Sequence, residues 1–186
     1  MSFDLSVVLL HDQMQDKHGK LVTASLTLID IHDIARSSRT YGVNTVFIAH
    51  PAPAIRKLAR TLKSHWQDGF GATYNPNRKE ALATVDIVTE LDEAIHKIEI
   101  RTAKLPLLIA TSARPGSDRT TFQALRGQLS NGEPHLLMLG SAWGMSEQLL
   151  ARANLLLEPI SGPGEYNHLS VRSACAIMLD RLIGIR

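Results

Sequence analysis

Short apolar runs alternate with amphipathic segments along nearly the whole chain. Six runs of four to six residues are rich in Leu, Val and Ile and are bounded by Gly, Pro, His or polar residues, which is typical of short buried strands. Between them, apolar residues recur at helical spacing. The predicted strands are 5–10, 45–49, 86–89, 107–111, 136–139 and 155–159, and the predicted helices are 30–41, 53–66, 91–101, 119–129, 146–153 and 167–183.

This alternation predicts an α/β fold with a mainly parallel sheet flanked by helices. The chain has 186 residues, of which 44% are hydrophobic. Both values are ordinary for one globular domain. Because no linker, repeat or low-complexity stretch interrupts the pattern, we expect a single domain over residues 1–186.

Two predicted helices have a distinctive surface. Helix 53–66 separates an apolar face from a basic face, which is either a solvated face or a contact for an RNA backbone. The apolar residues are Ile55, Leu58, Ala59 and Leu62, and the basic residues are Arg56, Arg60 and Lys63. The last helix is narrow at residues 173–176, which read SACA. Its small residues either pack on the chain's own sheet or form a dimer interface.

Composition excludes several classes of protein. The formal net charge of +2 is too small to indicate a nucleic-acid-binding protein by itself. A single cysteine, Cys175, rules out an intrachain disulfide, and its apolar surroundings indicate a core residue. No apolar run approaches the roughly 18 residues that span a bilayer, and the amino-terminal residues lack the pattern of a secretory signal. We therefore expect a cytoplasmic protein without membrane contact.

Most catalytic motifs are absent. The chain has no GxxxxGK[ST] motif and no GxSxG motif, and its GxG pieces at 69–71 and 162–164 lack the third glycine of a dinucleotide-binding fingerprint. The eight histidines show neither HExxH nor another paired metal-binding spacing. We expect no metal site.

Glycines concentrate in two loops of the last fifty residues. The strand at 136–139 is followed by GSAWGMS, and the strand at 155–159 is followed by ISGPGEYNHLSV. Glycines at the carboxyl end of a parallel strand permit a tight turn and a close approach of the backbone to a flat ligand. Either loop alone could be an ordinary turn, but two such loops at neighbouring strand ends predict one binding cleft. Asn167 or Ser170 is placed to cap the last helix.

These residues carry a resemblance to a known class. The stretches LLMLGSAWGM and LEPISGPGEYNHLSVRSACAI resemble the cofactor-binding motifs of the SPOUT class of S-adenosylmethionine (SAM)-dependent RNA methyltransferases. The stretch 30–43 is similar to the first motif of that class, in which an Arg, here Arg36, stands six positions before a Gly, here Gly42. The resemblance implies a deep trefoil knot in the carboxyl-terminal part of the chain, an exception to the rule that protein chains are unknotted.

Within the class, the chain is most similar to small bacterial proteins that resemble tRNA guanine-N1 methyltransferases. It differs from the branch that methylates ribose 2′-oxygens, which has Asn at the positions of Asp30 and Ser170 and a Glu where Ala142 and Trp143 stand. The resemblance implies a SAM site made of three segments, of which the one at 110–116 forms the third wall. Its residues are Thr111, Ser112, Ala113, Leu139, Gly140, Ser141, Trp143, Gly144, Met145, Ile160, Gly162, Tyr166, Asn167, Leu169, Ser170, Val171 and Ala174.

The class also implies candidates for catalysis. Arg36 and then Arg114 are the candidates for a guanidinium that orients a phosphate or the accepting atom. The alternative is that each forms a structural salt bridge, with Asp30 or Asp33 as the partner of Arg36. Glu165 is either a general base or a solvated loop carboxylate.

The resemblance therefore predicts a SAM-dependent RNA methyltransferase that acts on tRNA or rRNA and works as a homodimer without a metal ion. Two alternatives belong to other classes: a SAM-binding protein with a non-RNA substrate or a regulatory role, and a non-catalytic RNA-binding module.

Overall fold

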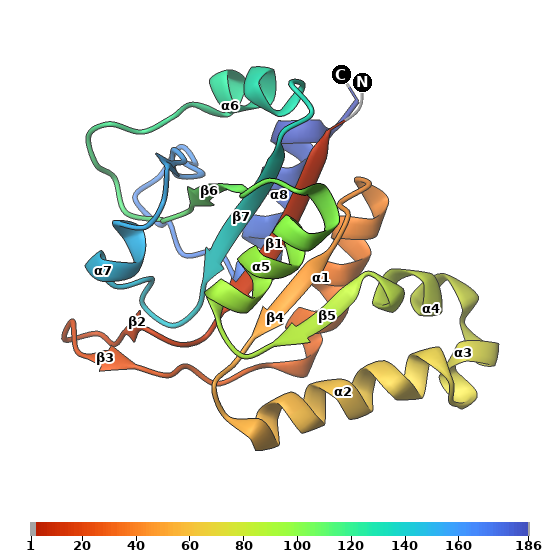
Figure 1. Ribbon diagram of the computed structural model, residues 1–186. Coiled ribbons are helices and arrows are strands. Elements are labelled where there is room, and N and C mark those ends of the chain that lie inside the picture. Colours follow the sequence, from red (N-terminus) through yellow and green to blue (C-terminus); the bar gives the residue numbers. More distant parts are fainter. Residues whose placement is uncertain (1–2, 186) are drawn as a thin grey trace.

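A sheet of six parallel strands forms the centre of the computed structural model, which describes residues 3–185 (Figure 1). The strand order is β5-β4-β1-β7-β6-β8, and every neighbouring pair is parallel. The six strands correspond to the six predicted apolar runs, so the predicted sheet is confirmed. Their bounds are β1 (Asp4–Leu10), β4 (Val46–Ala49), β5 (Val85–Val88), β6 (Leu107–Ala110), β7 (Pro134–Gly140) and β8 (Leu155–Leu156).

Helices cover both faces of this sheet, and each face has its own apolar core. The larger core lies under α1 (Leu28–Thr40), α2 (Pro53–Gln67), α4 (Pro76–Ala83), α6 (Phe122–Leu129) and α8 (Val171–Ile183). The smaller core lies under α5 (Leu91–Thr102) and α7 (Glu147–Leu150). The two-sided burial explains why the strands read as continuous apolar runs rather than as alternating patterns.

The last helix is packed in the middle of the larger layer, between α1 and α6. It runs parallel to α1. At one end, Arg172 Nη1 donates to Asp30 Oδ1 at 2.8 Å, and at the other the Tyr41 hydroxyl donates to Asp180 Oδ1 at 3.2 Å. Cys175 is fully buried on the core side of α8, as its apolar neighbours predict.

Several helix boundaries differ from the prediction because a side-chain cap fixes the first turn. The Ser170 hydroxyl accepts from the Ser173 N–H, so α8 starts at Val171 and Ser170, not Asn167, is its cap. Likewise the Thr121 hydroxyl accepts from the Ala124 N–H, and α6 starts three residues later than expected. Helix α7 is limited to four residues, beginning after the Ser146 cap.

The pattern missed the short elements between β4 and β5 and after β1. Segment 68–84 contains α3 (Phe70–Tyr74) and α4, where the Asn75 side chain caps the helix and Pro76 occupies its first turn. After β1, the antiparallel pair β2 (Met14–Gln15) and β3 (Leu21–Val22) forms a hairpin. Strands of two residues are too short to show an alternating pattern.

Helix α2 also differs from its predicted faces. Only Ala59 is fully buried, whereas Leu58 is 45% exposed. The Arg56 guanidinium folds back to donate to the carbonyl of His50 at 2.8 Å, and the Lys63 ammonium donates to the carbonyl of Val85. Two of the three basic residues expected to lie on one free face therefore bind backbone carbonyls instead.

Candidate functional site

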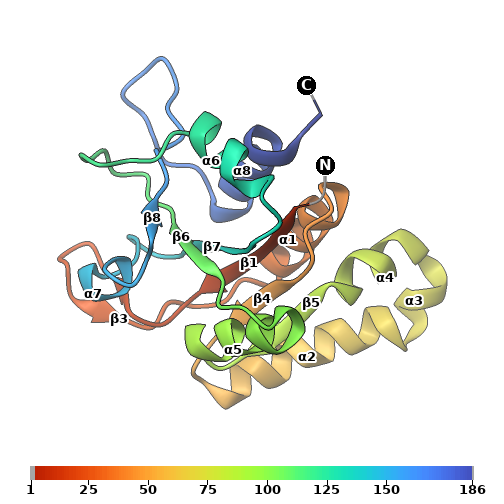
Figure 2. The same ribbon diagram turned by 45° about the horizontal axis from the view of Figure 1, so that its top comes forward.

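The loops that follow the strands meet at one edge of the sheet, because parallel strands end on the same side. Loop 111–121 after β6 lies against loop 157–170 after β8. Thr120 and Leu157 form a parallel bridge, and the Asn167 side-chain amide donates to the carbonyl of Ala113 at 3.2 Å. The Thr111 hydroxyl anchors the first of these loops by donating to the carbonyl of Met138 in β7 at 2.9 Å. Figure 2 shows the two segments beside each other at this end of the molecule.

Gly140 at the end of β7 and loop 141–146 form a tight turn that requires both Gly140 and Gly144. A Cβ on Gly140 would lie 2.9 Å from Met145 Cγ, which is too close without rearrangement. Gly144 has a φ of +105°, a conformation that side chains with a Cβ rarely adopt. The Ser141 hydroxyl donates to the carbonyl of Leu10 at 2.9 Å and ties the turn to β1. The predicted tight turn at the end of this strand is confirmed.

The β2–β3 hairpin closes over this turn. The Gln15 N–H donates to the Gly144 carbonyl at 2.8 Å, and the Trp143 N–H donates to the Gln15 carbonyl at 3.2 Å. Arg114 joins the group, with Nη1 donating to Gln15 Oε1 at 3.3 Å and Nη2 to the Trp143 carbonyl at 3.2 Å. Arg114 therefore links loop 111–121 to loop 141–146 through hydrogen bonds rather than through a salt bridge.

Exposed rings mark the surface between the loops. Trp143 is 57% exposed, and its ring centroid lies 6.5 Å from the centroid of the His168 ring. The His168 ring centroid also lies 6.5 Å from the centroid of the Tyr166 ring. Leu169 is 44% exposed beside them in sequence. A Cβ built on Gly162 would meet nothing within 4 Å. Apolar side chains left open around unfilled space are typical of a binding surface for an organic ligand.

The predicted cofactor residues fall into three groups. Thr111, Leu139 and Met145 are buried, so they offer backbone groups and hold the loops in place. Ile160, Val171 and Ala174 are half-buried against the larger core, beneath the loops. The remainder lie in the three loops and in the cap of α8, namely Ser112, Ala113, Gly140, Ser141, Trp143, Gly144, Gly162, Tyr166, Asn167, Leu169 and Ser170. The structure thus brings all three predicted segments to one edge of the sheet.

Arg36 does not form the salt bridge that was the alternative to its catalytic role. It is exposed on the second half of α1, about 12 Å along the helix from the first residue at 1.5 Å per residue. Among residues 3–185, none forms a hydrogen bond or ion pair with its guanidinium. The two acidic partners proposed for it, Asp30 and Asp33, are instead bound by Arg172, at 2.8 and 3.5 Å. The salt-bridge alternative for Arg36 is therefore wrong, while its catalytic role stays a prediction.

A pair of buried histidines at the same edge escaped the sequence analysis. His11 and His50 directly follow β1 and β4, and their ring centroids are 5.3 Å apart. His11 Nδ1 lies 2.9 Å from the carbonyl of Ala49, and His50 Nε2 lies 3.2 Å from that of Ala24, so both nitrogens carry a proton. In the sequence, a His directly follows each of two predicted strands, and this pattern could have predicted the pair.

Burial lowers the pKa of both His11 and His50 below the ordinary value of 6.5, because the charged ring loses solvation. His50 has a further reason to stay neutral, since its Nδ1 accepts from the Ala52 N–H at 3.1 Å. A second proton would remove this acceptor. In their neutral form, the two histidines therefore connect the ends of the central strands, through hydrogen bonds, to the segment before α1 and to the start of α2.

Comparison with known proteins identifies the family. A sequence profile described as SAM-dependent RNA methyltransferase matches residues 4–184. The chain belongs to this family. It is 43% identical, over 97% of its length, to a protein of Oleidesulfovibrio alaskensis named tRNA (guanine-N(1)-)-methyltransferase. It spans only 42% of that relative. A protein of Aquifex aeolicus without an assigned function is 37% identical over 95% of this chain and 86% of its own.

The fold agrees with this family. The SpoU methyltransferase AviRb of Streptomyces viridochromogenes, solved with the cofactor AdoMet, superimposes over 98% of this chain and 58% of its own with a TM-score of 0.59 and 15% identity. The six-stranded parallel sheet and the parallel bridge between loops 111–121 and 157–170 are consistent with the α/β knot of this class.

The residues at the three loops fit SAM, the cofactor of the family. Open space beside Gly144 and Gly162, where a Cβ would meet nothing within 4 Å, leaves the backbone accessible. The exposed side chains of Trp143 and Leu169 provide apolar surface for an adenosine group. Within residues 3–185, no three His, Cys, Asp or Glu side chains are grouped so that they could hold a metal ion.

Other surface features lie away from these loops. One open depression of about 580 Å³ lies on α2, and one of about 630 Å³ lies between the carboxyl ends of α1 and α8, next to Tyr41 and Ile183. Neither is lined by the predicted cofactor residues, and the convergence of three loops is the stronger indication of the site. None of the helices within residues 3–185 has the length and apolar character needed to cross a bilayer.

Proposed function

We propose that this chain transfers a methyl group from SAM to RNA. The observation that carries the proposal is the meeting of loops 111–121, 141–146 and 157–170 at the carboxyl edge of the sheet, with two hydrogen-bonded links between them. SAM supplies an activated methyl group on a sulfonium. The protein has then mainly to hold the donor and acceptor in line and to assist removal of a proton.

Backbone groups of the turn after β7 and of the loop before α8 hold the adenosine part of the cofactor in this proposal. The turn supplies Leu139, Gly140 and Gly144, whose positions are fixed by the pairing with β1 and the hairpin. The loop supplies Ile160 and Leu169. Thr111 and Ser112 lie beneath. These backbone groups give the specificity that a flat base requires without any charged side chain.

Arg36 and Arg114 orient the acceptor. Arg114 already lies among the loops, held by Gln15 and Trp143. Arg36 is free of competing ion pairs within residues 3–185 and is exposed, so its guanidinium is available for a phosphate or an accepting group. Glu165 lies on the exposed part of the loop before α8, which supports a solvated carboxylate as well as a base.

The substrate in this proposal is tRNA or rRNA. The relative that is named a tRNA (guanine-N(1)-)-methyltransferase supports tRNA, but its name describes a protein of which this chain spans 42%.

A methyl-transfer assay tests the proposal. Purified protein is incubated with SAM carrying a tritiated methyl group and with total tRNA or rRNA from cells that lack the gene, and the modified nucleosides are identified by mass spectrometry. We expect one methylated nucleoside in one RNA class. If SAM binds in a calorimetric titration but no RNA accepts the methyl group, the substrate is not RNA. If SAM does not bind, the chain is a non-catalytic module.

We further propose a cytoplasmic homodimer that uses α8. The exposed Ser173 and the half-buried Ala174 give a narrow strip beside the buried Cys175, which permits close approach of a second helix. Light scattering at micromolar concentration should give twice the chain mass of 20.5 kDa. A monomer of full activity would contradict the dimer.

A further inference from the structure

The segment between β4 and β5 has a charge unlike that of the rest of the chain. Residues 53–80 contain six Lys and Arg and two Asp and Glu, so their net charge is +4, while that of the whole chain is +2. The remaining residues are therefore net negative, at −2. This segment forms α2, α3 and the start of α4 at one side of the molecule, beyond β5 (Figure 1).

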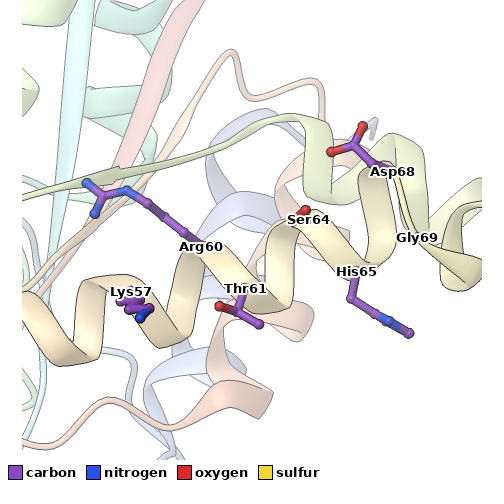
Figure 3. A pocket seen from close by; sticks show the side chains of 7 residues that line it. All are labelled: Lys57, Arg60, Thr61, Ser64, His65, Asp68 and Gly69. Carbon is purple, nitrogen blue, oxygen red and sulfur yellow. The ribbon is translucent and has the colours of Figure 1, made fainter.

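Two free basic residues of this segment, Lys57 and Arg60, line the depression on α2. Lys57 and Arg60 are exposed, and neither forms a hydrogen bond or ion pair with another of residues 3–185. Thr61, Ser64 and His65 continue the same surface toward Gly69, with Asp68 as its one carboxylate. Figure 3 shows these side chains spread along the helix. From Lys57 to the end of α2 at Gln67 the helix axis advances about 15 Å at 1.5 Å per residue, enough for several successive phosphates.

Two exposed aromatic rings extend this surface. Phe70 and Tyr74 of α3 are 76% and 75% exposed, and their rings are stacked with centroids 5.9 Å apart and an interplanar angle of 23°. Aromatic rings usually bury most of their surface. Two of them, parallel and open to solvent beside a basic helix, form a platform on which bases can stack.

The fold holds these rings in place. A Cβ on Gly69 would lie 2.7 Å from the His65 carbonyl, and one on Gly71 would lie 2.6 Å from the Trp66 ring, so α3 is drawn tightly against the end of α2. The Trp66 ring in turn has the Arg78 guanidinium 4.5 Å from its centroid. The corner between α2 and α3 is thus a packed structure that presents Phe70 and Tyr74 outward.

We propose that α2 and α3 form a binding surface for single-stranded RNA, with Lys57 and Arg60 contacting phosphates and with Phe70 and Tyr74 stacking on unpaired bases. The proposal rests on the proposed function, since it assigns part of the RNA substrate to this surface. The observation that favours RNA over a protein partner is the combination of unpaired positive charge with open aromatic faces. Because α2 starts directly after β4, the surface leads toward the edge of the sheet where the cofactor loops lie.

Binding measurements on variants test this surface. Fluorescence anisotropy is recorded with a labelled 20-nucleotide single-stranded RNA, and with the same sequence as a duplex. Phe70→Ala/Tyr74→Ala should weaken single-strand binding at least about tenfold and leave duplex binding within about twofold, because stacking needs unpaired bases. Phe70→Leu/Tyr74→Leu keeps apolar surface but removes the aromatic faces, and should lose affinity similarly. Wild-type affinity in the Leu variant would overturn the stacking.

Salt dependence tests the phosphate contacts. Lys57→Ala and Arg60→Ala should each reduce the slope of log Kd against log salt by about 0.7, the value for one phosphate contact on a single strand. Lys104→Ala is the control: Lys104 is an exposed lysine that precedes β6 and is already ion-paired with Glu133 at 2.8 Å, so it should not contact a phosphate and its slope should not change. Equal slopes for all four proteins would overturn the contacts.

Two further readouts separate this proposal from the proposed function. A protein that binds RNA through α2 and α3 but transfers no methyl group supports the surface and contradicts the function. A protein that methylates RNA while its RNA affinity is unaffected by every substitution overturns the surface alone. If Phe70→Ala/Tyr74→Ala converts a dimer to a monomer in light scattering, the rings form a protein interface, and the RNA surface is likewise overturned.

Discussion

Replacing Gly144 with Ala tests whether the turn after β7 touches the cofactor. Gly144 has a φ of +105°, and a Cβ there would meet no protein atom within 4 Å. The cost to the fold is therefore conformational, about 1–2 kcal/mol for an L-residue at positive φ. For a domain of this size, that cost corresponds to a decrease in Tm of about 2–8 °C. The added methyl group would stand in the open space where we place the ligand.

Gly132→Ala is the matched control. Gly132 also has a positive φ, of +76°, and a Cβ there also meets nothing within 4 Å, but it precedes β7 at the opposite edge of the sheet. Both variants should lose similar stability in thermal unfolding. In calorimetric titration with S-adenosylhomocysteine, Gly144→Ala should bind at least about tenfold more weakly and Gly132→Ala within about twofold of wild type. Unchanged affinity in Gly144→Ala, or equal losses in both, would refute the assignment of the site.

Three other predictions concern individual ionisable side chains or pairs of them. Burial lowers the pKa of His11 and His50 in the folded protein, so the unfolded chain binds protons first as the pH falls below about 6.5. Tm should therefore decrease between pH 7 and pH 5. The decrease should be smaller in His11→Asn, whose side-chain amide keeps a donor near the position of Nδ1. Burial raises the pKa of the Cys175 thiol to about 12, so a disulfide reagent at pH 8 should label it only as the protein unfolds, and rapid labelling of native protein would contradict this. Arg36→Ala should lower the rate of methyl transfer by about 10²-fold or more while Tm and cofactor affinity stay unchanged, and Arg36→Lys should recover little of the rate. A full single-turnover rate in Arg36→Ala would remove Arg36 from the site.

The sequence was most informative where burial is strongest. The apolar runs that became β1 and β7 are buried on both sides, so composition alone identifies them. The turn at Gly140 and Gly144 was also recognisable, because each glycine has a steric reason to be there. The position of α8 between α1 and α6 was not, since it depends on contacts such as Arg172 with Asp30, 142 residues apart.

The site was predicted less completely for the same reason. The partners of Arg114 come from Gln15, in a hairpin too short to be recognised, and from the Trp143 backbone. The pairing of His11 with His50 depends on two strands that are neighbours in the sheet, and it brings together residues 39 positions apart in sequence. The hydrogen bonds of Arg56 and Lys63 depend on which backbone carbonyls lie within reach of their side chains. Helical periodicity does not predict those contacts.

The central position of β1 also affects how the protein is made. One edge of β1 pairs with β4, but the other must wait for β7, which begins 124 residues after β1 ends. At about 5–20 residues per second, a ribosome needs about 6–25 s to supply that partner. Until then, a strand whose residues 5–10 are buried in the finished fold presents an open backbone edge. Chains that stop before residue 134 keep this edge, and we expect them to aggregate or to be held by chaperones.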